Sequence, residues 1–350
     1  MLKRRFEKGN QFWECTLNVG SAGSAWLDIR SADLGAFAPS RVRRFKSEAA
    51  AKVALDKEVV ARLKEGWIDT ADRAAAPAVP SSDPLKSLMA AVDAAWPGAR
   101  ECVSLLSPGV FFLNLADTRR WKIDDLSPLR GLQVHSLAID GTFTDLEPLT
   151  SLPLTSLSIG TFSGKPGQTP LRKLDGVERL SGLEALGVLN ASVESLAPLQ
   201  GMRLKKLTVT GGSFRDLAPL RGMPLQTLTL RSAAVDDLGP LEGMPLQGLE
   251  LAGTSVRDIS VLTNMPLNWL DLTDTRVSDL SALSKTVTLR NLKIAGTEVT
   301  DVSMAAGWPE LTFVELSPEK IQAGLDLLRK LKTIKEINRK PARAFWKTLA

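Results

Sequence analysis

The side chains that most often carry enzyme chemistry are scarce in this sequence. It has a single histidine, His135, no tyrosine, and two cysteines, Cys15 and Cys102, that lie far apart. Histidine is the usual general acid or base, and histidine and cysteine are the usual zinc ligands. Any catalysis would therefore depend on carboxylates, lysine or arginine. We expect no catalytic residue, no metal site and no cofactor.

Two pairs of adjacent carboxylates are the best remaining acid–base candidates, Asp124 with Asp125 and Asp236 with Asp237. The alternative is structural, because an aspartate just before a short helical turn can accept its free N–H groups. Prolines follow in the first turn, where a missing N–H costs least. The capping position recurs along the chain, at Asp237, Asp258, Asp279 and Asp301. We therefore favour caps over acid–base chemistry.

One segment, GTFSGKPGQTP at 160–170, invites comparison with a phosphate-binding loop. One residue too few separates Gly160 from Gly164, and Pro166 stands where Ser or Thr should bind the metal. We expect instead a surface loop that could contact a partner.

A leucine frame with a step of 21 residues organises the elements around these candidates. Its members are Leu186, Leu207, Leu228, Leu249 and Leu270, and Leu292 follows 22 residues later. A fixed period of about 20–29 residues with this frame is the signature of leucine-rich repeats. Stacked coils bury such leucines at about 1.5–3 kcal/mol each and join their strands into a parallel sheet. Threonines take the position where the usual consensus has Asn or Cys, at Thr254, Thr275 and Thr297.

The whole frame, L-x-PL-x-GMPL-x-x-L-x-L-x-GT-x-V-x-D, resembles the leucine-rich repeats of bacterial proteins, especially those attached to serine/threonine kinases of planctomycete type. The likeness runs from DPLKSLMAAVDAAWPGA at 83–99 to LSPEKIQAGLDLLRKLKTIKEI and PARAFWK near the end. No kinase motif is present in the sequence. The resemblance implies a recognition scaffold and not phosphoryl transfer.

The alternation of side chains along each strand predicts which residues face solvent. The predicted solvent side includes Thr210, Thr229, Gly248 and Ala252, which are small or polar, and one large aromatic residue, Trp269. Trp and Arg often carry binding energy at interfaces. The predicted partner-binding residues are Arg231, Glu250, Trp269, Asp271, Lys293 and Phe313. The alternative is that Trp269 only covers its own sheet.

Residues 1–69 follow another pattern. RRFEKGNQFWECTLNV alternates like half-buried strands, and KSEAAAKVALDKEVVARLKEGW indicates a helix capped by Ser47 and ended by Gly66. The segments RFE at 5–7, FWE at 12–14 and 45–67 resemble the WGR domain. In that family the Trp-Gly-Arg motif is tied to DNA-end contacts, but here WLDIR stands near its place. Phe12, Trp13 and Trp26 could form a small core or a platform for bases.

The densest basic cluster also lies in this segment and consists of Arg41, Arg43, Arg44 and Lys46. It could contact phosphates or keep an edge strand soluble. Basic side chains exceed acidic ones by 5 in residues 1–66 and by 6 in 317–350, whereas acidic ones exceed by 6 in between. Basic ends permit an anionic partner, or are simply solvated faces.

The sequence thus predicts an α/β fold in three parts. A small strand-rich α+β, WGR-like domain at 1–69 is followed by an Ala-, Pro- and Ser-rich linker at 70–82 and a leucine-rich-repeat solenoid with a parallel sheet at 83–350. We expect helical caps at both ends of the solenoid, the second opening at Ser317 and including Ile321, Leu325 and Leu331.

The composition and the motifs together predict a non-enzymatic scaffold or adaptor that binds a protein partner. The alternative is a regulator that contacts DNA or RNA through residues 1–69. The sequence has no apolar run long enough to span a membrane, and two distant cysteines suit a reducing compartment, so we expect a cytoplasmic protein.

Overall fold

The computed structural model describes residues 2–8, 11–19, 25–33, 40–64, 68–69, 84–116, 123–143, 145–160 and 171–349. Two compact units emerge, Met1–Ser87 with Leu105–Val110, and Leu88–Ser104 with Phe111–Ala350. The predicted linker at 70–82 and residues 161–170 of the predicted loop lie outside the described residues, as do Gly66 and Asp83. The division at 69 and 83 stays a prediction. Within the described residues, no helix is long and apolar enough to cross a membrane.

The first unit contains a five-stranded sheet in the order β4-β3-β2-β1-β5 and one helix. The strands are β1 (Leu2–Lys8), β2 (Gln11–Val19), β3 (Ala25–Asp33), β4 (Ser40–Phe45) and β5 (Ile68–Asp69), and the helix is α1 (Glu48–Lys64). All the strand pairs described here are antiparallel. This confirms the predicted strand-rich domain with one helix. The Ser47 hydroxyl accepts the N–H of Ala50 at 3.3 Å, as predicted for the N-cap.

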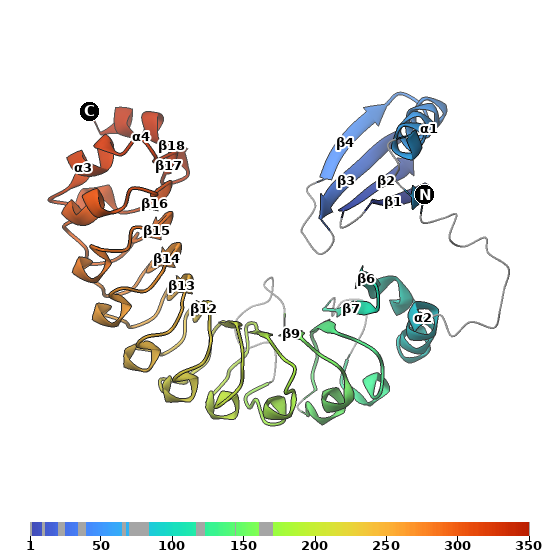
Figure 1. The fold of residues 1–350 in the computed structure, drawn as a ribbon, viewed down its shortest axis with the longest axis horizontal. Coiled ribbons are helices and arrows are strands. Elements are labelled where there is room, and N and C mark those ends of the chain that lie inside the picture. The colour runs from blue at the N-terminus through green and yellow to red at the C-terminus, as the bar shows by residue number, and fades with distance from the viewer. Residues whose placement is uncertain are drawn as a thin grey trace. The chain divides into compact units, whose positions relative to one another are not determined.

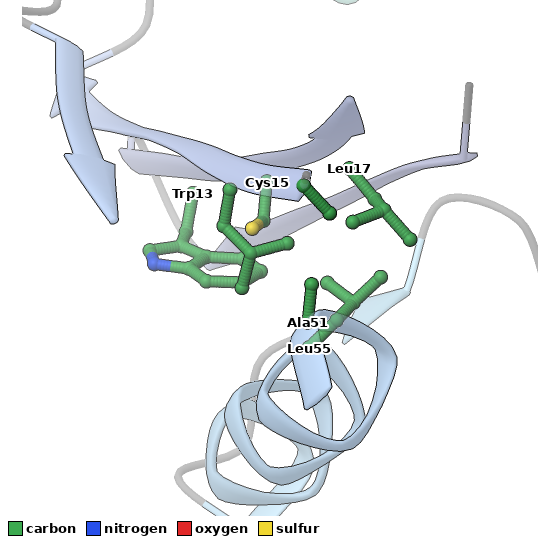
Figure 2. Close-up of a cluster of buried hydrophobic side chains, with 7 residues drawn as sticks. Trp13, Cys15, Leu17, Ala51 and Leu55 are labelled. Carbon is green, nitrogen blue, oxygen red and sulfur yellow. The ribbon is translucent and has the colours of Figure 1, made fainter. Parts of the chain in front are cut away.

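Alternation along β2 and β3 directs one set of side chains toward α1. Trp13, Cys15 and Leu17 from the sheet pack with Ala51 and Leu55 from the helix, and all are buried (Figure 2). Trp13 is therefore a core residue, as the first of the two interpretations held. Trp26 belongs to the opposite face, because its neighbours Ala25 and Leu27 point into the core, and it is half-buried.

The second sheet has 13 strands in the order β18 to β6. They are β6 (Val103–Ser107), β7 (Val110–Leu115), β8 (Ser136–Ile139), β9 (Ser156–Ile159), β10 (Ala185–Val188), β11 (Lys206–Val209), β12 (Thr227–Thr229), β13 (Gly248–Glu250), β14 (Trp269–Asp271), β15 (Asn291–Lys293), β16 (Phe313–Glu315), β17 (Glu336–Ile337) and β18 (Lys340–Pro341). Helix α2 (Pro84–Ala95) precedes them, and α3 (Leu325–Lys330) and α4 (Ala342–Thr348) lie at the end of the chain. From β7 to β17 every described pair is parallel, so the predicted solenoid is confirmed.

The leucine frame sets the register of this sheet. Leu207 pairs with Leu228, Leu228 with Leu249, Leu249 with Leu270, and Leu270 with Leu292, and all five are buried. Figure 1 shows the strands along one side of the stacked coils and short 3-10 turns along the other. The extra residue between Leu270 and Leu292 falls outside the strands, since the two leucines still pair.

The return segments confirm the predicted caps and threonines. In each of seven coils a carboxylate Oδ1 accepts, at 2.7–2.8 Å, the N–H two residues later, which opens the 3-10 turn. The carboxylates are Asp125, Asp145, Asp216, Asp237, Asp258, Asp279 and Asp301. The buried hydroxyls of Thr254, Thr275 and Thr297 each donate at 2.7 Å to the carbonyl three residues earlier. These cap and threonine hydrogen bonds thus lie within single coils.

The single helix predicted from Ser317 to Leu331 is wrong. A 3-10 turn at Pro318–Lys320 and helix α3 are separated by a parallel bridge between Asp301 and Ala323. Gly324 then has φ 88°, and an added Cβ would lie 2.3 Å from the backbone nitrogen of Ser303. The chain therefore passes too close to the preceding coil for a continuous helix. After α3 the chain forms β17, which pairs in parallel with β16.

A further position recurs on the turn side of the coils. Met223, Met244 and Met265 are buried there, and Thr286 and Trp308 take the same place in the next two coils. The indole N–H of Trp308 donates to the Leu283 carbonyl of the preceding coil at 2.8 Å. The buried Thr286 hydroxyl has no hydrogen-bond partner among the described residues.

We expect Thr286→Val to stabilise the protein, because it removes a buried polar group without a partner. The gain should be about 1 kcal/mol or more, whereas Thr254→Val, which breaks a buried hydrogen bond, should cost about 1 kcal/mol. Urea denaturation of both variants measures this. An equal loss for both would mean that the Thr286 hydroxyl is satisfied.

The capping aspartates should make the stability of the protein depend on pH. Hydrogen bonds from the backbone and then the side chain of Ser260 hold the pKa of Asp258 below its ordinary value. A carboxyl group whose pKa is lower in the folded state than in the unfolded state stabilises the protein at pH values above its unfolded-state pKa. This contribution is lost as the pH falls through the folded-state pKa. Asp258→Asn should therefore be less stable than the parent at neutral pH, and the difference should shrink as the pH falls below the ordinary aspartate pKa of about 3.9. A difference that persists in acid would contradict this. Asp236→Asn, which leaves the cap by Asp237 intact, is the control.

A candidate partner-binding hollow

Parallel pairing places side chains from successive coils in rows across the sheet. One row contains Gly248, Trp269, Asn291 and Phe313, which are direct neighbours on β13 to β16. The adjacent row on the same side contains Glu250, Asp271, Lys293 and Glu315. The two rows are two residues apart on each strand, so their side chains leave the same face.

All six predicted partner-binding residues line one hollow of about 430 Å³ on this face. The complete lining is Arg231, Glu250, Trp269, Leu270, Asp271, Asn291, Lys293 and Phe313. These residues are spread over five coils in the sequence, and the fixed register brings them together. The volume falls within the range of about 300–1,000 Å³ that is usual for binding pockets.

Trp269 leans back over the preceding strand. A Cβ built at Gly248 would lie 2.2 Å from Nε1 and Cε2 of the indole, so the ring covers the glycine backbone. Gly248 is consequently buried, and Trp269 keeps part of its surface exposed. Trp269 therefore covers its own sheet, as the alternative held, and it also lines the hollow.

Ion pairs hold the charged side chains of the second row. The Arg231 guanidinium donates to Oε1 of Glu250, from Nε at 2.7 Å and also from Nη2. Nζ of Lys293 lies 3.2 Å from Oδ2 of Asp271 and 3.8 Å from Oε2 of Glu315. The other Asp271 oxygen, Oδ1, accepts the N–H of Thr273 at 3.0 Å. Glu250 and Asp271 thus each bind a neighbouring cation, and Asp271 also accepts a backbone N–H.

Several positions predicted to face solvent are buried. These are Thr210, Thr229, Gly248 and Asp271. Gly248 is covered by the indole, and Asp271 lies beneath Lys293. Strand alternation gives the direction of a side chain correctly but not what its larger neighbours cover.

Two features of the site escaped the sequence analysis. Asn291 lies between Trp269 and Phe313, is exposed, and could have been included from its place in the repeat. Arg339, whose Nε donates to Oε1 of Glu315 at 2.7 Å, extends the row of ion pairs. It comes from the turn between β17 and β18, outside the leucine frame, so no signal in the repeat pointed to it.

The predicted basic cluster of the first unit is divided between the two faces of β4. Arg43 pairs with Leu27, a residue of the face that packs on α1, and its Nη1 lies 3.3 Å from Oε1 of Glu58 on that helix. Arg44 pairs with Trp26 on the opposite face and is exposed. Lys46 is exposed beyond the strand, and the side chain of Arg41 lies outside the described residues.

The other residues singled out for chemistry have structural partners. Asp125 and Asp237 cap turns, and Oδ2 of Asp236 lies 3.6 Å from Nη1 of Arg215. The ring nitrogen Nδ1 of His135 accepts the Phe111 N–H at 3.4 Å. The described part of the chain has no cluster of three or more His, Cys, Asp or Glu side chains arranged to hold a metal ion.

We expect Gly248→Ala to destabilise the protein by about 1–3 kcal/mol, because its methyl group would displace the Trp269 ring. Gly187→Ala is the matched control on β10, where the nearest atom to a Cβ is the Ser158 hydroxyl oxygen at 3.3 Å. That change should cost less than about 1 kcal/mol. Thermal denaturation of both variants distinguishes them, and equal behaviour would contradict the described position of the indole.

Comparison with a solved structure supports the repeat fold. An internalin (inlF) from Listeria monocytogenes is 20% identical, with a TM-score of 0.50 over 74% of this chain and 88% of the internalin. An internalin C2 (inlC2) from the same species is 23% identical, with a TM-score of 0.45 over 49% and 78% of the two chains.

No model of a known protein family matches the chain, and no curated protein matches it. The similarity to solved structures therefore supports the fold alone, and the function has to be inferred from the residues of the hollow. The chain folds as a leucine-rich-repeat solenoid similar to that of an internalin, preceded by a small antiparallel sheet.

Proposed function

We propose that the chain is a non-enzymatic scaffold that binds a protein partner in the hollow around Trp269. The observation that carries the proposal is the convergence of Trp269, Phe313 and Arg231 on one open hollow of about 430 Å³. Partly exposed aromatic residues and arginines at the centre of a concave surface are typical of the residues that dominate binding energy.

The charges of the hollow suit binding better than catalysis. Its two carboxylates, Glu250 and Asp271, are held by Arg231 and Lys293, and a general acid or base would need to reach a substrate proton. A second hollow of about 160 Å³ over β9 to β11 offers no aromatic side chain. We therefore assign the interaction to β13–β16.

The alternative, a regulator that contacts nucleic acid through a WGR-like domain, rests on the sequence resemblance. Arg44 and Trp26 are cross-strand neighbours on the face away from α1, an arrangement that could pair a cation with a stacking ring. Fluorescence anisotropy of the full chain with duplex DNA would select this function if binding weakened with salt and with Arg44→Gln but not with Arg43→Gln. The cytoplasmic location is likewise proposed from the sequence.

A photo-crosslinking residue at Asn291, within the hollow, should capture a protein in the cells that naturally express the chain. The same residue at Ser278, which is exposed on a return segment, should not. Trp269→Ala should weaken capture about 30-fold, the equivalent of a 2 kcal/mol contribution. Denaturation of the variant provides the folding control. Equal capture at both positions, or capture that is indifferent to Trp269, would contradict the proposal.

A further inference from the structure

The charged side chains of the hollow are arranged in two levels. The cations reach outward, with 57% of the Arg231 side chain and 35% of the Lys293 side chain exposed. Their carboxylate partners lie beneath, with only 16% of Glu250 and 8% of Asp271 exposed. The hollow is lined by two cations and two carboxylates, yet its solvent-facing level is positive.

The same arrangement continues beyond the hollow. Arg339 is 80% exposed above Glu315, which is 16% exposed and also lies 3.8 Å from Lys293. Arg339 occupies a turn at φ 60°, in the left-handed region that non-glycine residues rarely adopt. Its guanidinium nevertheless meets Glu315 through Nε, which leaves four further N–H donors for a ligand.

Aromatic surface lies beside this positive level. Trp269 and Phe313 flank the exposed amide of Asn291 in the adjacent row. Glu336 is the next residue of that row and is an exposed carboxylate, so the row becomes unfavourable for an anion at its far end. The favourable strip is therefore bounded, with an apolar slot on one side and cations on the other.

We propose that the hollow binds an acidic, extended peptide segment of its protein partner. A large apolar side chain of the segment lies between Trp269 and Phe313, and carboxylates on either side of it meet Arg231, Lys293 and Arg339. The mostly buried carboxylates hold these cations in place before the peptide binds, so the cations lose less side-chain entropy on binding. This inference rests on the proposed function and specifies the chemistry of the partner.

The geometry also sets the length of the segment. Arg231 follows β12 and Arg339 follows β17, so five strand spacings of about 4.8 Å separate them, roughly 24 Å. An extended chain advances about 3.3 Å per residue, and about seven residues span the strip.

The test is selection from a displayed library of random peptides of about twelve residues against the full chain, followed by anisotropy with labelled peptides from the selection. We expect enriched peptides to carry Asp or Glu on both sides of an aromatic or aliphatic residue and to require Trp269. Binding should weaken about tenfold or more in Arg231→Gln/Arg339→Gln, and should also weaken with added salt. Arg257→Gln/Arg276→Gln is the matched control, because it removes the same charge from exposed return segments and should leave affinity unchanged.

Each contrary outcome has a distinct meaning. Peptides that require Trp269 but lack acidic residues, or that bind Arg231→Gln/Arg339→Gln equally well, would overturn the inference and leave the proposed function intact. Competition by inorganic phosphate at matched ionic strength would replace the peptide with a small anion. If no enriched peptide requires Trp269 for binding, the inference is overturned. The proposed function is tested separately, by photo-crosslinking at Asn291.

Discussion

The stacking of one leucine on the next, coil after coil, is the constraint on which the remaining structure depends. Leu207, Leu228, Leu249 and Leu270 are buried because each pairs with its neighbour in the parallel sheet. A single coil has no partner for its apolar side, so stability is gained between coils. The same register then positions every other side chain, including those of the hollow.

The regularity of this step made most of the solenoid predictable. Leucines, capping aspartates and turn threonines recur at fixed positions, so one understood coil describes its neighbours. The register also predicted that Arg231, Trp269 and Phe313 would lie together. Features that depend on contacts between particular coils could not be predicted in this way. The close approach of Gly324 to Ser303, which interrupts the expected last helix, is one example, and the placement of Arg339 beside Glu315 is another.

Burial at the candidate site shows the same limit. Alternation along β13 and β14 gave the correct face for Gly248 and Asp271, yet both are covered by a neighbour from the next strand. Coverage depends on the size and the rotamer of that neighbour, and neither is encoded in the period of the repeat. In Trp269, one part of the indole shields Gly248 while another part stays accessible. A structural contact thus fixes the aromatic surface that we assign to binding.

The central claim is that the face of β13–β16 is where a protein partner binds. Hydroxyl-radical footprinting of the full chain, with and without a partner recovered by crosslinking, measures this directly, since the oxidation of individual aromatic side chains can be read by mass spectrometry. The account predicts that the partner protects Trp269 and Phe313, while the half-buried Trp346 on α4 is oxidised equally in both samples. Unchanged oxidation of Trp269 and Phe313, with protection of Trp26 instead, would contradict it.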